Sequence, residues 1–246
     1  MTEIGIGALA LGFVVFVFGG LVKGTLGVGL PLVAVPLMSL AIPATQAMAL
    51  VMMPVLVSNV WQAFEGELSW QGLRRFAPLI GALLVSTALT VPLTLNLPEA
   101  TLRSLLAGIV LLAVVLMALP LRLSVAPRFE RWWSLVVGAL SGVMGGVSTL
   151  TGPIIITYLV SLRLPRDMFV GIISIIYLAG AVPLYGSMAA HGRISLTDAT
   201  LSLAALVPMA CGLLIGRQVR SHLSEGWFRR LLFGFLVVVA GLLLLR

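Results

Sequence analysis

Long apolar stretches, separated by short polar connections, make up most of this chain. A helix needs about 20 mostly apolar residues to cross the hydrocarbon core of a bilayer. The pattern predicts ten apolar segments, which cover approximately residues 4–22, 26–42, 44–64, 76–95, 101–119, 133–147, 150–164, 168–190, 199–216 and 228–245. The second and the seventh of these segments are shorter than a full span. We therefore expect an all-α polytopic membrane protein.

Residues 19–43 do not have the composition of a lipid-facing helix. They contain five glycines, three prolines and Lys23, the only lysine of the chain. Non-helical backbone at membrane depth is tolerated only where it is buried in protein or lines a cavity. We expect two short helices that meet at a glycine-rich break, with Lys23 and Thr25 at the junction. Broken helices of this kind are typical of the binding sites of secondary transporters.

The second half of the chain repeats this pattern. A shift of 122 aligns residues 20–43 with residues 142–165 without a gap, and it matches Gly20/Gly142, Gly24/Gly146, Pro31/Pro153 and Pro43/Pro165. A shift of 126 aligns a later stretch, in which it matches Glu99/Glu225 and Arg103/Arg229. The match predicts two repeats, 1–121 and 122–246, each with a broken-helix hairpin and three transmembrane helices.

Composition and charge agree with a membrane location. The chain is 60% hydrophobic and only 9% charged, against about 25% charged residues in soluble domains. The net charge of +7 comes from short connections between apolar segments, so we attribute it to cytoplasmic loops and not to nucleic-acid binding. In the ten-segment topology, 12 of the 15 basic residues fall on one side. This predicts Ser124 inside, Ser195 outside and both termini outside. An odd number of crossings per half would make the repeats inverted.

Enzymatic chemistry has little support in the sequence. Cys211 is the only cysteine, which excludes an internal disulfide and a cysteine metal cluster. The chain has no HExxH, GxSxG or P-loop motif, and GTLGVG lacks the strand and the acidic partner of a dinucleotide site. No carboxylate lies well inside an apolar segment, which argues against an acidic proton relay. We expect no enzyme activity, no cofactor and no metal.

The two breaks are the candidate binding site. The helix that follows each break offers unpaired N–H groups and the positive end of its dipole to an anion. Lys23 adds a charge, and hydroxyl and amide side chains add hydrogen-bonding groups. The candidate substrate-binding residues are Lys23, Gly24, Thr25, Gly27, Gly29, Gln46, Asn59, Ser148, Thr149, Thr151, Gly152 and Tyr177. We expect the breaks to approach each other near the midplane.

Each of these candidates also has a structural interpretation. Glycines allow close helix packing, and hydroxyls can bond back to the backbone. Amides and a phenol can simply bridge helices. Lys23 could be a loop residue at the cytoplasmic end of the first segment. The sequence leaves these alternatives open.

Three motifs resemble the TauE/SafE sulfite-exporter family: GGLVKGTLGVGLPLVAVP at 19–36, GVMGGVSTLTGPIII at 142–156, and GELSW at 66–70. The chain departs from the usual family run GIGGGxxxVP at Leu30 and Pro31. The resemblance implies a carrier, and specifically an exporter, of sulfite, organosulfonates or related small anions in a bacterial inner membrane. The expected partners are this small anion and the lipid bilayer, without nucleic acid. A homo-oligomer, a carboxylate carrier, an anion channel and a non-transporting subunit stay open.

Overall fold

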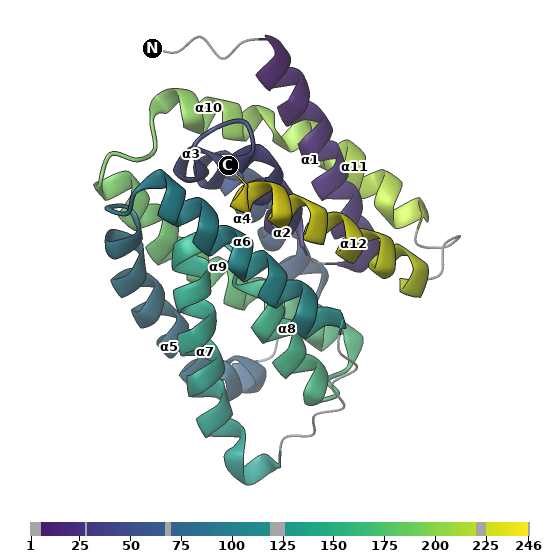
Figure 1. Ribbon diagram of the computed structural model, residues 1–246. Helices are drawn as coiled ribbons and strands as arrows, with labels where there is room; N and C mark the ends of the chain where they lie inside the picture. Colours follow the sequence, from purple (N-terminus) through teal and green to yellow (C-terminus); the bar gives the residue numbers. More distant parts are fainter. Residues whose placement is uncertain (1–5, 28, 67–69, 119–125, 220–224, 246) are drawn as a thin grey trace. The chain divides into compact units, whose positions relative to one another are not determined.

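The computed structural model describes residues 6–27, 29–66, 70–118, 126–219 and 225–245 (Figure 1). Within these residues the chain is helical and no strand is present. The elements are α1 (Ile6–Leu26), α2 (Leu30–Ser39), α3 (Ala44–Leu50), α4 (Met52–Glu65), α5 (Trp70–Thr94), α6 (Glu99–Ala118), η1 (Pro127–Phe129), α7 (Glu130–Ser148), α8 (Gly152–Ser161), α9 (Arg166–Ala190), α10 (Leu196–Ala204), α11 (Leu206–Val219) and α12 (Glu225–Leu244).

Five helical stretches of the described chain are long and apolar enough to cross a membrane. They are Ala44–Glu65, Gly72–Thr94, Glu99–Ala118, Asp167–Ala190 and Leu196–Val219. Two further apolar helices, α2 and α8, have only ten residues each. This is the all-helical, multi-pass architecture that the hydrophobic pattern predicts, including the two short segments.

The chain forms two compact units, and each unit takes segments from both halves of the sequence. The first contains residues 1–55, 98–111 and 193–246, and the second contains residues 56–97 and 112–192. These units are defined by contacts, whereas the predicted repeats 1–121 and 122–246 are defined by sequence equivalence. The repeat boundaries therefore stay a prediction, as does the inversion of one repeat relative to the other.

In the first unit, α1 lies along α11, and glycines of both helices lie at the contact (Figure 1). A Cβ atom at Gly20 or Gly24 would clash with the α11 carbonyl of Met209 or Leu213, and one at Gly212 would clash with α1. Glycines spaced by four residues let two helix backbones approach this closely. α2 packs on α1, α3 and α12, and the Phe18 and Phe235 rings meet edge to face at 5.3 Å.

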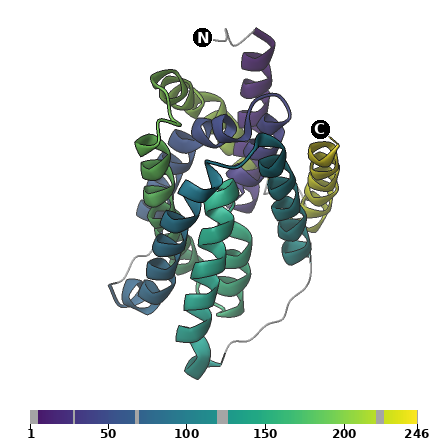
Figure 2. The same cartoon turned by 60° about the vertical axis from the view of Figure 1, so that its left-hand side comes forward.

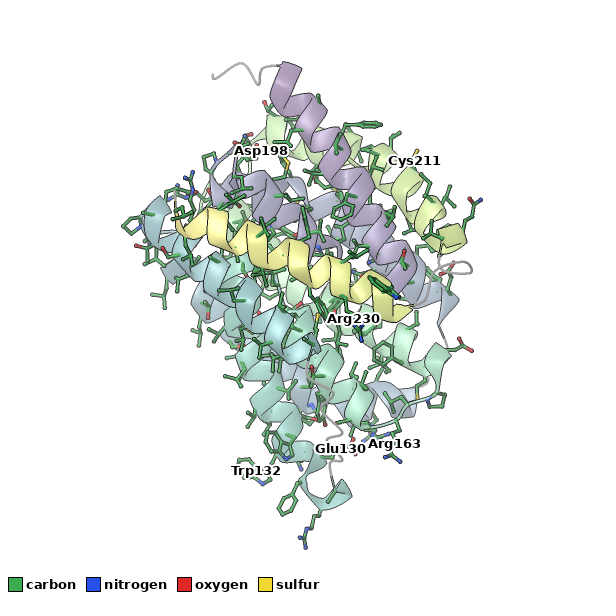
Figure 3. The ribbon with its side chains drawn as sticks, turned by 45° about the vertical axis from the view of Figure 1, so that its right-hand side comes forward. Glu130, Trp132, Arg163, Asp198, Cys211 and Arg230 are labelled. Carbon is green, nitrogen blue, oxygen red and sulfur yellow. The ribbon has the colours of Figure 1, made fainter. Side chains whose placement is uncertain are left out.

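In the second unit, α5 and α7 lie side by side in the same way (Figure 2). A Cβ atom at Gly142 would lie 2.7 Å from the Leu83 carbonyl oxygen and 3.0 Å from the Thr87 nitrogen. The hydroxyl of Thr87 donates to the Gly142 carbonyl at 3.3 Å. At the far end of the pair, Arg75 and Glu130 form a salt bridge between α5 and α7; Glu130 is labelled in Figure 3.

These two contacts are equivalent under the sequence repeat. Gly142 follows Gly20 by 122 residues, while Met209 and Leu213 follow Leu83 and Thr87 by 126 residues. The shifts of 122 and 126 found in the sequence therefore relate both partners of each contact. In each unit the hairpin of one half packs against a helix of the other half.

Two of the apolar segments are interrupted, and proline explains both interruptions. A proline removes the hydrogen bond to the carbonyl four residues earlier and clashes with it. Pro54 and Pro208 lie four residues after the points where α3 ends at Leu50 and α10 ends at Ala204. The interrupted backbone is satisfied within the first unit, because the Met53 N–H donates to the Ser202 hydroxyl of α10 at 2.9 Å.

Candidate functional site

The two breaks have matching backbone geometry in their respective units. At the first break the Gly27 N–H donates to the Lys23 carbonyl at 2.7 Å, and at the second the Thr149 N–H donates to the Gly145 carbonyl at 2.7 Å. Gly27 and Thr149 both have left-handed backbones, with φ of 81° and 64°. The short helices then begin 122 residues apart, at Leu30 and Gly152. These two hydrogen bonds therefore join positions that the predicted repeat makes equivalent.

Neither short helix has a side chain that caps its N-terminus. The N-cap residues are Gly29 for α2 and Thr151 for α8, and each helix has a proline in its first turn. The first N–H groups of a helix have no partner inside the helix, so without a cap they are available to another acceptor. Pro153 has no N–H, so the first-turn donors of α8 are the N–H groups of Gly152 and Ile154.

The start of α8 is surrounded by small residues and hydroxyl groups. The Tyr177 hydroxyl of α9 lies 2.7 Å from the point that a Cβ atom at Gly152 would occupy. The Thr151 methyl group fills the space beside Gly145 of α7 and lies 3.8 Å from a Cβ position at Gly180 of α9. This packing turns the Thr151 hydroxyl away from α7. Neither hydroxyl makes a hydrogen bond with the residues that the structure describes.

Three other predicted hydroxyl groups are used by the backbone. Thr25 donates to the Leu21 carbonyl at 2.8 Å and lies 3.3 Å from the Gly216 carbonyl of α11. Ser148 donates to the carbonyl four residues earlier and accepts the Leu150 N–H at 3.2 Å. Thr149 donates to the Ser148 carbonyl. Their hydrogens are therefore not available to a ligand in this arrangement, and Thr151 and Tyr177 are the hydroxyl donors that remain.

The first break differs from the sequence expectation in one respect. Lys23 and Thr25 lie in the last turn of α1, because the helix continues to Leu26, and the non-helical link starts at Gly27. Lys23 is only 5% exposed, which does not fit a lysine in a solvated loop. A Cβ atom at Gly27 would meet open space, whereas Gly24 packs against the Leu213 carbonyl.

The remaining candidates lie on other helices. Gln46 of α3 donates its amide to Asp198 at 3.1 Å within the first unit. Asn59 of α4 is 2% exposed and belongs to the second unit, as do Thr151, Gly152 and Tyr177. The structure thus places Thr151, Gly152 and Tyr177 together. The approach of the two breaks to each other stays a prediction, and so does each binding role.

Gly145 and Gly180 are residues of this site that the sequence analysis did not single out. Gly145 is the repeat equivalent of Lys23, and its missing side chain makes room for the Thr151 methyl group. Gly145 could have been identified from the sequence, because the shift of 122 aligns this glycine with Lys23. The charge at the first break is therefore not duplicated at the second.

Comparison with known families now identifies the chain. Neither the curated proteins nor the solved structures contain a match to it. The family model described as "Sulfite exporter TauE/SafE" matches residues 11–243, which is nearly the whole chain. Together with the membrane-capable helices, this match shows that the chain is a multi-pass membrane protein of the sulfite exporter TauE/SafE family.

Proposed function

We propose that this protein is a secondary transporter that exports a small anion, such as sulfite or an organosulfonate, across a bacterial inner membrane. The proposal further assigns anion binding to the N-terminus of α8. One observation carries this assignment: α8 starts without a cap, beside the unengaged hydroxyl groups of Thr151 and Tyr177. Family membership supports the transport class.

The chemistry at this helix end suits an oxyanion. The first N–H groups of a helix carry partial positive charge, and the aligned peptide dipoles add to it. Sulfite and sulfonate groups have several oxygens, so they can accept bonds from backbone N–H groups and from hydroxyls at once. The start of α8 is partly buried, and hydrogen bonds to a charged group are stronger in such a place than in water.

The first break provides a related arrangement in its own unit. α2 also starts without a cap, and the Lys23 ammonium group adds positive charge one turn before the break. In our proposal both breaks bind the transported anion, with the fixed charge supplied by the first repeat alone. We infer that both breaks bind the same anion from the repeat symmetry that is typical of this class of transporter.

The test is ligand binding and transport by the purified protein. Sulfite, thiosulfate, sulfoacetate and a carboxylate of similar size should be compared by thermal stabilisation and by calorimetry. We expect sulfur oxyanions to stabilise the protein most, and we expect reconstituted vesicles to show saturable flux with counterflow. Flux without saturation or counterflow would favour a channel, and preference for the carboxylate would change the substrate class.

A pair of threonine variants tests the α8 site directly. Thr151→Val should weaken anion binding about tenfold or more, because a hydrogen bond to a charged group contributes about 1.5–3 kcal/mol. Thr157→Val is the matched control, since the Thr157 hydroxyl lies further along α8 and donates to the Pro153 carbonyl at 2.8 Å. Equal affinity in both variants and the parent would place the anion elsewhere.

A further inference from the structure

The first unit contains a cavity of about 170 Å³ that the proposed transport site does not use. It lies among α1, α2, α3 and the bend between α10 and α11. Gln46 is the only polar residue among those that line it. Phe16 and Leu50 form part of its wall and are themselves almost fully buried. The cavity is therefore an apolar chamber inside the unit.

The polar groups beside the cavity argue against an anion inside it. Gln46 uses its amide to donate to the Asp198 Oδ1 atom at 3.1 Å. The other Asp198 oxygen accepts the Ser195 N–H at 3.0 Å and the Ser195 hydroxyl at 2.6 Å, so the carboxylate is fixed at the start of α10 (Figure 3). No lysine or arginine is among the described residues that line the cavity. A sulfite or sulfonate group there would lose its hydration and meet a negative charge behind Gln46.

The mouth of the cavity is on an apolar flank. Phe13 lines the cavity and is 56% exposed. The helices that line the cavity carry further exposed apolar side chains, including Val14 of α1, Leu203 of α10 and Val207 of α11. Residues 196–219 form a candidate membrane span, so a flank of this kind faces hydrocarbon. The mouth of the cavity therefore opens toward lipid and not toward water.

An apolar chamber of this size takes an apolar guest. Engineered apolar cavities of about 150 Å³ stay free of water and bind molecules such as benzene. In a bilayer the abundant apolar group at the mouth is the acyl chain of a lipid. We propose that this cavity binds the end of one lipid acyl chain, which enters past Phe13 and lies against Phe16 and Leu50.

Photolabelling with a lipid that carries a diazirine near the end of its acyl chain tests the proposal. The full-length protein would be placed in bilayer nanodiscs, irradiated and mapped by peptide mass spectrometry. We expect adducts on Leu50, which is only 6% exposed and out of reach of lipids that merely cover the surface. Adducts on exposed residues such as Val14 and Val207 without any on Leu50 would overturn the proposal.

A cavity-filling variant sharpens the test. A Cβ atom at Gly12 would meet only the Met38 Cε atom, at 3.8 Å, so Gly12→Leu can grow into the cavity without a backbone clash. It should abolish the Leu50 adducts, while Gly7→Leu, at an open position of the same helix, should retain them. Leu201→Phe fills the cavity from α10 and serves if Gly12→Leu does not fold.

The same variants separate this cavity from the transport site. Gly12→Leu should leave anion-induced stabilisation unchanged, because no residue of either break is among those that line the cavity. Loss of anion binding in Gly12→Leu would overturn the lipid assignment and make the cavity part of the substrate site. Undiminished Leu50 adducts in both filled variants would overturn it as well. Labelling that benzene abolishes but excess unlabelled lipid does not would identify a small-solute site instead.

Discussion

Thr149 has the most unusual backbone of the candidate site. It is a β-branched residue with φ of 64°, a conformation that costs an ordinary L-residue roughly 1–2 kcal/mol. Its equivalent in the first repeat is Gly27, which adopts φ of 81° without that cost. Strained residues persist where the surrounding structure enforces them, and they cluster at ligand sites. The second break is thus the more constrained of the two, in agreement with its assignment as an anion site.

Lys23 should matter more than any hydroxyl group. A hydroxyl gives the anion one hydrogen bond to a charged group, which contributes roughly 1.5–3 kcal/mol, whereas the Lys23 ammonium group gives such a bond and also the attraction between two full charges. We expect Lys23→Met to weaken anion binding about tenfold or more, because 1.4 kcal/mol corresponds to one decade. The measurement is the affinity of the folded, purified variant, so that misinsertion is not mistaken for lost binding.

Lys23→Arg is the matched control for this prediction. It keeps the positive charge and should retain part of the affinity, although the larger guanidinium group must fit a position that is 5% exposed. If Lys23→Met binds like the parent while Thr151→Val does not, the lysine has a role in topology or packing alone.

Two tyrosines of α9 provide a comparison within one helix. Tyr177→Phe removes the hydroxyl beside Gly152 and should weaken anion binding about tenfold or more, since the lost hydrogen bond is to a charged group. Tyr185→Phe removes a buried hydroxyl that has no partner among the described residues, so it should leave binding unchanged and the protein equally or more stable. Calorimetry and thermal unfolding of both variants check this. Equal effects of the two substitutions would contradict a specific role for Tyr177.

The residue types of the site are readable from the sequence, but their hydrogen-bond partners are not. The breaks and their hydroxyls follow from the glycine and threonine pattern. The use of the Thr25 and Ser148 hydroxyls by backbone carbonyls depends on rotamers and on a neighbouring helix almost two hundred residues away. Such partners are set by tertiary packing, which a local pattern does not encode.

At the scale of helices, the glycines divide into two groups with different expected roles. Gly20 and Gly142 have the backbone of a neighbouring helix against them, whereas Gly81 and Gly108 have open space. Glycine within a helix lowers stability by about 1 kcal/mol relative to alanine unless close packing requires it. The first group should therefore be intolerant of alanine and the second should not.

Alanine substitution tests this division. Gly20→Ala and Gly142→Ala should each lower the free energy of unfolding by roughly 1–3 kcal/mol, because the added methyl group overpacks a backbone contact. Gly81→Ala and Gly108→Ala are the controls, and they should be neutral or stabilising by up to about 1 kcal/mol. Thermal unfolding in one detergent compares all four. A fully tolerated alanine at Gly20 would contradict the close α1–α11 contact.

The order and type of the helices follow from the sequence better than their ends do. The two short segments predict α2 and α8, which have ten residues each in the structure. The glycine pattern predicts a break with Lys23 at the junction, whereas α1 continues through Lys23 to Leu26. Gly20 and Gly24 stay helical because α11 packs directly against them. Tertiary contact here outweighs the low helix propensity of glycine.

For the whole molecule, the distribution of basic residues is the strongest guide to orientation. Twelve of the 15 lysines and arginines fall on one side of the predicted topology, and cytoplasmic connections carry such an excess. The loop after α9 contains His191 and belongs to the side with few basic residues, whereas Ala126 precedes η1 on the side with many. Ser124, which the predicted topology also places inside, is outside the described residues.

Cysteine accessibility in intact cells tests this orientation. In a Cys211→Ser background, Ala126→Cys should be protected from an impermeant thiol reagent and His191→Cys should react, since both positions are exposed on the protein surface. Membrane disruption should make Ala126→Cys reactive, which controls for local burial. Labelling of position 126 but not of position 191 in intact cells would reverse the orientation. The two helices of each pair, α1–α2 and α7–α8, either cross the membrane or form a hairpin that re-enters it. Both arrangements leave the same connections on the same side of the membrane, so this test of orientation applies to either one.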